Sequence, residues 1–246
     1  MARRARASGA EVVVVFDTHW MVNSGYHINC GAHFEDVYTS NELPHFIQDL
    51  EYSYDGCPAL GEKIAKAANA SGVRTLAHNI DSLKLEYGTL VPMRYMHMEA
   101  EKDQAFKVIS VASWDAWHDL EDSIAFGAAV RSAIEASDYK VMVLASGSLS
   151  HRFTDNRSAA ENMHRWSREF DHQVDLHVVD LWRQGKFNEF KAMLPDYAEH
   201  CYGEGGMHDT AMLMGVLGKD YHGKAEILTE PFGSSGTGQI NAVFPL

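Results

Sequence analysis

Two histidines and one glutamate follow predicted strands of this sequence, at the points where those strands end. His19 comes soon after the valine-rich run Val12–Phe16, and His151 follows the apolar run "YKVMVLAS". Glu230 ends the run "AEILTE". In open α/β sheets, ligands bind beyond the carboxyl ends of the strands. If these strands are parallel neighbours, the three side chains therefore meet at one edge of the sheet.

Two imidazoles and one carboxylate can bind one face of an octahedral Fe(II) ion and leave the opposite face open, as in non-haem oxygenases. The alternative is that these are three unrelated loop residues.

Two further motifs favour no particular chemistry. The segment "SGSLSH" lacks the Gly-x-Ser-x-Gly turn of a serine nucleophile. The loop "GSSGTG" lacks the Lys-Ser/Thr of a phosphate-binding loop, and close approach of its backbone to a ligand explains it as well.

The elements that must position these residues alternate between strands and helices. Short β-branched runs bounded by Gly, Ser, Asn or Asp predict six strands: "EVVVVFD", "VRTLAHN", "FKVISVAS", "YKVMVLAS", "AEILTE" and "INAVFP". Strands that alternate with helices favour an α/β fold with a mostly parallel or mixed central sheet and helices on both faces. We find no linker or repeat, and we predict a single domain over residues 1–246.

Helices are predicted between the strands. One begins at Pro58 and ends before Gly72, and another follows the acidic cap at Asp119. The longest ends at about Gln184, before Gly185. Its apolar stripe is spaced by three and four residues and consists of Met163, Trp166, Phe170, Val174, Val178 and Leu181. Two stretches, residues 21–57 and 81–98, are predicted to be rich in loops. Because they are rich in aromatic residues and histidine, we expect them to serve function.

Composition excludes several classes of protein. The 246 residues contain 21 Lys and Arg against 34 Asp and Glu, a net charge of −13. An acidic chain is a poor candidate for nucleic-acid binding, because phosphate contacts need clustered cations. No apolar run approaches the roughly 20 residues that a membrane span needs, and no signal peptide is apparent. The three cysteines fit a reducing cytoplasm rather than a disulfide framework.

Several separate blocks of the sequence resemble one enzyme family. These blocks are "VFDTHWMVNSGYHINC", "YTSNELPHFI", "SLKLEYGTLVPMRYM", "LASGSLSHRF", "CYGEGGMHDTAML" and "SSGTGQINAVFP". Together they resemble the class III extradiol ring-cleaving dioxygenases, most closely the branch that cleaves homoprotocatechuate (3,4-dihydroxyphenylacetate). The resemblance covers nearly the whole chain from Val12 onward. It implies an oxidoreductase of aromatic catabolism that uses dioxygen and cleaves a catechol to a muconic semialdehyde.

The resemblance also implies roles for single residues. His19 in "FDTHW" and Glu230 in "ILTEPF" match Fe(II) ligands of the family. His151 in "GSLSH" matches the family's acid–base histidine, so the resemblance replaces its role as a ligand with a role in proton transfer. Tyr87 in "EYGTLVP" stands where many relatives carry histidine, and we expect it to donate a hydrogen bond to the substrate or the oxygenated intermediate. An imidazole suits proton transfer because it titrates near neutral pH.

Three further residues are candidates for supporting roles. The carboxylate of the implied substrate needs a cation, and Arg152, next to His151, is a candidate; an ordinary surface charge explains it as well. The loop after His19 contains Asn23, His27 and His33, which are expected to line the substrate site or to pack over it. Asp17 lies two residues before His19 on the same face of the strand. It either orients His19 or caps the loop.

The resemblance implies one feature that this sequence lacks. Family members begin with another strand that carries an Ile-Thr-His-Val-Pro-like segment, whose histidine is the second metal ligand. Here the strand Val12–Phe16 lies behind only "MARRARASGAE". We therefore expect the single catalytic domain to lack that strand and most of the following helix. A start codon placed too late is the favoured explanation, and a truncated protein is the alternative.

Other functions stay open on the sequence alone. One is a metal-free binding protein, or an inactive truncated paralogue, on the same scaffold. Another is a metal-dependent hydrolase that holds zinc through His19 and Glu230, since these ligands accept iron, manganese or zinc. For the leading hypothesis we expect a cytoplasmic homo-oligomer whose partners are a catechol and dioxygen, with no nucleic acid and no membrane.

Overall fold

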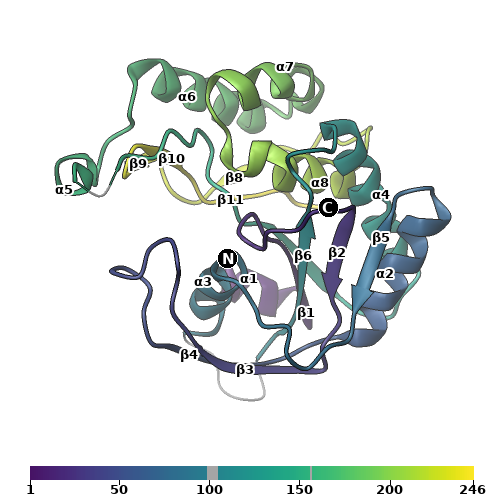
Figure 1. Ribbon diagram of the computed structural model, residues 1–246. Coiled ribbons are helices and arrows are strands. Elements are labelled where there is room, and N and C mark those ends of the chain that lie inside the picture. The colour runs from purple at the N-terminus through teal and green to yellow at the C-terminus, as the bar shows by residue number, and fades with distance from the viewer. Residues whose placement is uncertain (99–104, 156) are drawn as a thin grey trace. The chain divides into compact units, whose positions relative to one another are not determined.

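A computed structural model describes residues 1–98, 105–155 and 157–246 of the chain (Figure 1). The chain forms two compact units. Unit 1 consists of Met1–Ser146 together with Asp209–Val216, and unit 2 consists of Gly147–His208 together with Leu217–Leu246. Each unit is described by itself below. The single catalytic domain expected over residues 1–246 stays a prediction.

Unit 1 is built on a five-stranded sheet with the strand order β5-β2-β6-β1-β7. β1 pairs in parallel with both β6 and β7, β2 pairs in parallel with β5, and β2 runs antiparallel to β6. The predicted mostly parallel or mixed sheet is therefore confirmed. The strands are β1 (Val12–Phe16), β2 (Tyr26–Asn29), β5 (Thr75–His78), β6 (Lys107–Ser113) and β7 (Val141–Ala145).

The valine run of β1 is buried because both faces of the sheet are covered. Successive side chains of a strand point to opposite faces. Val12, Val14 and Phe16 belong to one apolar cluster, and Val13 and Val15 belong to another. A strand covered on both faces reads as a continuous hydrophobic run instead of an alternating one, which is what the sequence of β1 shows.

Helices cover each face, as the sequence predicts. The cluster around Phe16 includes side chains from α2 (Pro58–Ala70) and α4 (Leu120–Glu135) and from the part of α8 (His208–Leu217) that belongs to unit 1. In Figure 1, α2 runs beside β5. The cluster around Val13 includes side chains from α1 (Ala2–Ala7) and α3 (Tyr87–His97).

The two stretches predicted to be rich in loops contain more regular structure than expected. Residues 21–57 hold β2 and an antiparallel hairpin of β3 (His33–Tyr38) and β4 (Leu50–Asp55). Most side chains of the hairpin are polar or exposed, so its apolar pattern is too weak to predict a strand. Residues 81–98 hold α3, which accommodates Pro92 within the helix.

Unit 2 contains helices and two antiparallel two-stranded sheets. Its long helix α6 spans Glu169–Gln184 and ends at Gly185, whose φ of 74° gives the left-handed cap that the glycine predicts. Its remaining elements are α5 (Ala159–Asn162), α7 (Phe187–His200), the 3-10 helix η2 (Glu204–Met207), β8 (Glu226–Ile227), β9 (Phe232–Ser234), β10 (Thr237–Gln239) and β11 (Ala242–Val243).

The prediction that the apolar stripe of α6 begins at Met163 is wrong. Residues 163–167 instead form backbone hydrogen bonds with the turn between β9 and β10. Ser235 and Gly236 donate to the carbonyls of Met163 and Arg165, and Ser167 donates to the carbonyl of Gly236. Backbone groups that are satisfied by a neighbouring turn are not available for helical hydrogen bonds. The helix therefore begins only at Glu169.

The loop "GSSGTG" forms the tight β9–β10 hairpin. Gly236 has a φ of 94° at the turn, a conformation that favours glycine. A Cβ on Gly233 would collide with the backbone of Arg165, and a Cβ on Gly238 would collide with the carboxylate of Asp175. These glycines are therefore explained by close packing within unit 2.

The strand before Glu230 does not join the central sheet. β8 pairs with β11 in a separate antiparallel two-stranded sheet of unit 2. The three side chains meet at one sheet edge only if their strands are parallel neighbours. That condition is met by β1 and β7 but not by "AEILTE". In the part of the chain that the structure describes, no helix has the length and apolar character that crossing a membrane requires.

Candidate active site

The end of β1 places His19 in a loop that a buried carboxylate holds together. Asp17 accepts hydrogen bonds from the backbone N–H groups of His19 (2.8 Å) and Trp20 (3.1 Å) and from the hydroxyl of Thr89 (2.6 Å). Asp17 is almost fully buried. Burial raises its pKa, and the hydrogen bonds from Thr89 and the loop offset part of that shift. Asp17 therefore fixes the backbone on which His19 stands.

α3 brings Tyr87 against His19. The two rings stack with their centroids 3.9 Å apart. Gly88 follows Tyr87, and a Cβ there would collide with the carboxylate of Asp17, so glycine lets the start of α3 approach the loop. The structure thus brings together two residues that the sequence predicts to act in one site.

Glu42 connects both rings and was missed by the sequence reasoning. The hydroxyl of Tyr87 donates to Oε2 of Glu42 at 2.8 Å, and Nδ1 of His19 lies 3.6 Å from the same oxygen. Glu42 lies between β3 and β4 in the segment "YTSNELPHFI", so its only sequence signal was its place in a block shared with the resembled family.

The other candidates in the loop after His19 lie in different surroundings. Asn23 is exposed in the bend before β2. His27 lies on β2, where its Nδ1 is 2.8 Å from Nε2 of His78 on β5. Burial lowers the pKa of both histidines. His33 lies on the exposed hairpin and is 2.8 Å from Asp55, which raises its pKa.

His151 lies in unit 2 and is held by backbone and side-chain contacts. The backbone N–H of His151 donates to the carbonyl of Cys201 at 3.1 Å. His151 also forms an isolated antiparallel β-bridge with Thr237. Nε2 of His151 lies 3.5 Å from Oε2 of Glu204, a nearly buried carboxylate. The same oxygen accepts the N–H of Ser148 at 2.6 Å. Glu204 therefore contacts both the first and the last residue of the segment 148–151, which ends at His151.

A second buried carboxylate supports this segment from the preceding residue. Asp175 on α6 accepts hydrogen bonds from the hydroxyl of Ser150 (2.7 Å), the hydroxyl of Tyr197 (2.6 Å) and the indole N–H of Trp166 (2.8 Å). Asp175 is fully buried, and burial raises its pKa. Ser150 immediately precedes His151, so this network fixes the backbone of the candidate acid–base residue.

Arg152 and Glu230 lie elsewhere in unit 2. The guanidinium of Arg152 lies over the ring of Tyr202, 4.0 Å from its centroid. Glu230 is strongly exposed after β8, and its Oε2 lies 3.3 Å from Nη2 of Arg183. Among the described residues of either unit, no three His, Cys, Asp or Glu side chains form a group that could hold a metal ion.

Comparison with protein families decides the class of this chain. The family model for the catalytic LigB subunit of aromatic ring-opening dioxygenase matches residues 1–245. The chain belongs to this family. Extradiol dioxygenases of the LigB family use a metal cofactor. Membership confirms the resemblance to extradiol ring-cleaving dioxygenases, and the chain is accordingly an enzyme of that class.

Individual relatives agree with this class. The chain is 56% identical over 233 residues to a 3,4-dihydroxyphenylacetate 2,3-dioxygenase of Escherichia coli, covering 94% of this chain and 83% of that protein. It is 24% identical to the 2-aminophenol 1,6-dioxygenase beta subunit of a Pseudomonas species, over 82% of this chain and 68% of the relative.

A solved structure supports the fold alone. It is the crystal structure of an uncharacterized protein from Escherichia coli K12, and its TM-score is 0.63 at 16% identity. The similarity covers 98% of this chain and 89% of that chain. The α/β architecture predicted from the sequence is thereby confirmed for this LigB family member.

Proposed function

We propose that this chain cleaves 3,4-dihydroxyphenylacetate with dioxygen, at the ring bond next to the two hydroxyl groups, to give a muconic semialdehyde. The observation that carries the proposal is 56% identity across 94% of the chain to an enzyme named for this reaction. Identity at this level over nearly the whole chain favours a shared substrate, whereas the 2-aminophenol relative is only 24% identical.

We propose Fe(II) as the metal, with His19 and Glu230 as two of its ligands. Imidazole and carboxylate are donors that Fe(II) accepts. Nδ1 of His19 faces Glu42, which favours binding of a metal through Nε2, because ligating histidines commonly place their other nitrogen against a carboxylate. When bound, Fe(II) supplies binding positions for the catechol oxygens and dioxygen and lowers the pKa of a bound hydroxyl.

His151 is proposed to move the proton of the reaction. The imidazole of His151 accepts a proton from a catechol hydroxyl as the substrate binds and returns it when the ring opens. Glu204, 3.5 Å from Nε2, fixes the orientation of the ring and leaves Nδ1 to face the substrate. Tyr87 is proposed to donate its hydroxyl hydrogen bond to the bound substrate or oxygen. The stacked ring of His19 holds the ring of Tyr87 in place. The single hydroxyl proton, which Glu42 accepts in this structure, turns from Glu42 to the substrate.

The remaining proposals concern the substrate and the assembly. Arg152 and Asn23 bind the substrate, with Arg152 at the carboxylate. Asp17 acts on His19 through the loop backbone. For the whole protein we propose a homo-oligomer in the cytoplasm.

The proposal is tested by supplying the purified chain with Fe(II), 3,4-dihydroxyphenylacetate and dioxygen. We expect oxygen uptake in equal amount to the substrate consumed and a yellow ring-opened product. No turnover would contradict the proposal and favour a binding protein or an inactive paralogue.

A further inference from the structure

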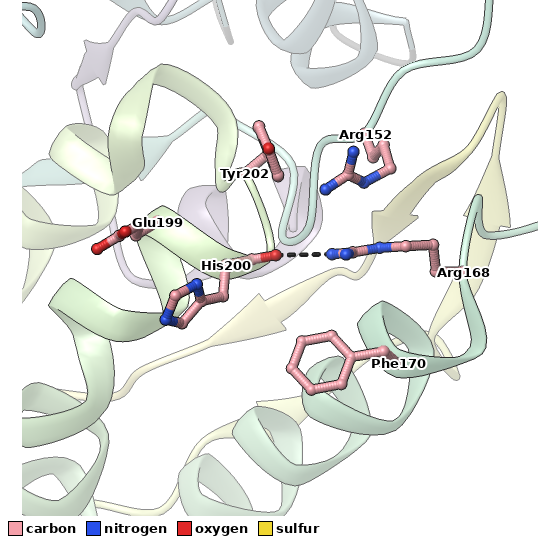
Figure 2. Close-up of a pocket in the computed structure, with 6 residues that line it drawn as sticks. All are labelled: Arg152, Arg168, Phe170, Glu199, His200 and Tyr202. Atoms are coloured by element: carbon pink, nitrogen blue, oxygen red, sulfur yellow. Dashed lines mark hydrogen bonds between the residues drawn. The ribbon is translucent and has the colours of Figure 1, made fainter.

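An open pocket of about 420 Å³ lies within unit 2, and His151 is not among the residues that line it. Figure 2 shows the two guanidinium groups of this pocket directed toward the same space, between two aromatic rings. The residues that line it come from the segment after His151, from the start of α6 and from the end of α7 with the turn beyond it: Arg152, Arg168, Phe170, Glu199, His200 and Tyr202.

Arg168 is fixed in the wall of this pocket. Its Nε and Nη2 donate to the two carboxylate oxygens of Asp171, and Nη2 also donates to the carbonyl of His200 at 2.6 Å. The guanidinium carbon lies 5.4 Å from the centroid of the Phe170 ring. Asp171 is fully buried, so Arg168 is held by a charge-assisted pair that cannot rearrange without leaving a buried carboxylate unpaired.

Arg152 is held less completely. Its guanidinium lies over Tyr202, and its Nε lies 4.0 Å from Asp171, beyond hydrogen-bond distance. Among the described residues, the buried Nε of Arg152 has no hydrogen-bond partner. The position over Tyr202 thus orders a cationic group whose Nε has no hydrogen-bond acceptor among the described residues.

The charges of the pocket leave an excess of positive charge. Asp171 is the one carboxylate near both guanidinium groups among the described residues, and it already accepts two hydrogen bonds from Arg168. Glu199 also lines the pocket, but Figure 2 shows its carboxylate directed away from both arginines. One guanidinium charge therefore remains available to an anion that enters.

We propose that this pocket binds an aromatic carboxylate, with the carboxylate between Arg152 and Arg168 and the ring against Phe170 and Tyr202. Planar guanidinium groups suit a carboxylate because they present parallel N–H donors. Aromatic walls favour a flat apolar ligand over a simple inorganic anion. The ligand is either the catechol substrate itself, in which case this inference rests on the proposed function, or a separate aromatic acid.

Binding is tested on the purified chain by titration calorimetry, without added metal or turnover. The probes are 4-hydroxyphenylacetate and 4-methylphenol, which differ by the carboxylate. We expect the acid to bind and the phenol to bind at least roughly tenfold more weakly, because a charge-assisted hydrogen bond is lost. Equal affinity for both probes would overturn the proposal.

Variants of Arg152 connect binding to the pocket. Arg152→Gln should weaken binding of 4-hydroxyphenylacetate roughly tenfold or more, and Arg152→Lys should weaken it less because the charge stays. Arg157→Gln removes an exposed arginine of the same unit and should leave binding unchanged. We choose Arg152 because Arg168 pairs with a buried carboxylate and its loss endangers folding. Unchanged binding in Arg152→Gln would contradict the proposal.

A kinetic arm identifies the source of the ligand. If the pocket holds the substrate, Arg152→Gln raises the KM for 3,4-dihydroxyphenylacetate but not for 4-methylcatechol, and 4-hydroxyphenylacetate inhibits competitively. If it holds a separate acid, calorimetric binding is lost in Arg152→Gln while the KM for both catechols is unchanged, which would refute the role in substrate binding proposed for Arg152. Calorimetry needs no turnover, so the two proposals can fail separately. A chain that binds the acid but cleaves no catechol refutes the proposed function, whereas the proposal that this pocket binds an aromatic carboxylate still holds.

Discussion

At the scale of single residues, carboxylates that the sequence did not single out hold the candidate catalytic groups. Glu204 lies 3.5 Å from Nε2 of His151, and Glu42 lies 3.6 Å from Nδ1 of His19. A carboxylate next to an imidazole favours one orientation of the ring. The roles proposed for both histidines therefore depend on acidic neighbours that lie far from them in the sequence.

Replacement of His151 should stop proton transfer and leave folding intact. We expect His151→Gln to lower kcat/KM for 3,4-dihydroxyphenylacetate by roughly 100-fold to 10,000-fold, the usual contribution of an acid–base residue. Steady-state oxygen uptake measures this effect. His164→Gln, at an exposed histidine of the same unit, serves as the control. A similar loss in both variants would argue against a specific role for His151.

Replacement of Glu42 should weaken metal binding although Glu42 is not a proposed ligand. Glu42→Gln removes the charge opposite Nδ1 of His19 and weakens the acceptor for Tyr87. We expect the affinity for Fe(II), measured by anaerobic titration, to fall about 10-fold to 100-fold. Glu35→Gln changes an exposed carboxylate on β3 and should have no effect. Equal affinities in Glu42→Gln and the unchanged protein would refute this role of Glu42.

Asp115 should make the stability of the metal-free protein depend on pH. Its pKa is raised from 3.8 to about 7, chiefly by burial and also by the carboxylate of Asp17, while the hydrogen bond from Ser113 and the charge of His19 oppose the shift. The folded state therefore binds a proton more tightly than the unfolded state. Its stabilising contribution is complete below about pH 4 and is lost as the pH rises toward 7.

The measurement is the Tm of the chain and of Asp115→Asn between pH 4 and 7, with a chelator present. The unchanged chain should lose stability relative to Asp115→Asn as the pH rises, and the exposed control Asp138→Asn should follow the unchanged chain. A constant difference in Tm between the chain and Asp115→Asn would contradict the expected titration.

At the scale of elements, the central sheet could be predicted from the sequence because its strands are covered on both faces. The valines of β1 and the apolar run of β6 are continuous, so neither segment fits the pattern of an amphipathic helix. Pro58 and Gly72 mark the start and the end of α2 in the sequence. The β3–β4 hairpin could not be predicted, since its exposed polar residues hide the strand period. Likewise, the start of α6 is set by pairing with the distant β9–β10 turn, which local sequence does not encode.

The residues of the candidate site likewise divide into those that the sequence could identify and those that depend on tertiary contacts. Asp17 and His19 could be found because they directly follow a strand whose pattern is plain. Glu42, Glu204 and Asp175 could not be assigned, because each acts through tertiary contacts with residues far away in the sequence, such as Tyr87, Ser148 and Tyr197. No local sequence spacing predicts such contacts, whereas a motif such as "FDTHW" can be recognised from the sequence alone.

The contact of α6 with the segment before His151 should be essential to unit 2. Asp175→Ala leaves the donors of Ser150, Tyr197 and Trp166 without their buried acceptor. Each buried unsatisfied donor costs roughly 1–3 kcal/mol, so we expect a loss of at least about 3 kcal/mol in the free energy of unfolding. Urea unfolding followed by tryptophan fluorescence measures this. Asp180→Ala, on an exposed turn of α6, should change stability by less than about 0.5 kcal/mol.

At the scale of the whole molecule, membership of the LigB family joins residues of both units in one proposed reaction. His19 and Tyr87 belong to unit 1, whereas His151 and Glu230 belong to unit 2. The strand pattern brings His19, His151 and Glu230 to one sheet edge only if their strands are parallel neighbours, and the strand before Glu230 is not one. The family match over residues 1–245 shows the class of the chain, and the joint site of these residues is proposed from the resemblance.

The identity of the product tests the central claim most directly. The chain, supplied with Fe(II), is given 3,4-dihydroxyphenylacetate and isotopically labelled dioxygen, and the product is analysed by mass spectrometry. We predict a yellow muconic semialdehyde that has gained both atoms of one dioxygen molecule. A product without label, a product with the ring intact, or cleavage between the two hydroxyl-bearing carbons would contradict extradiol cleavage by this protein.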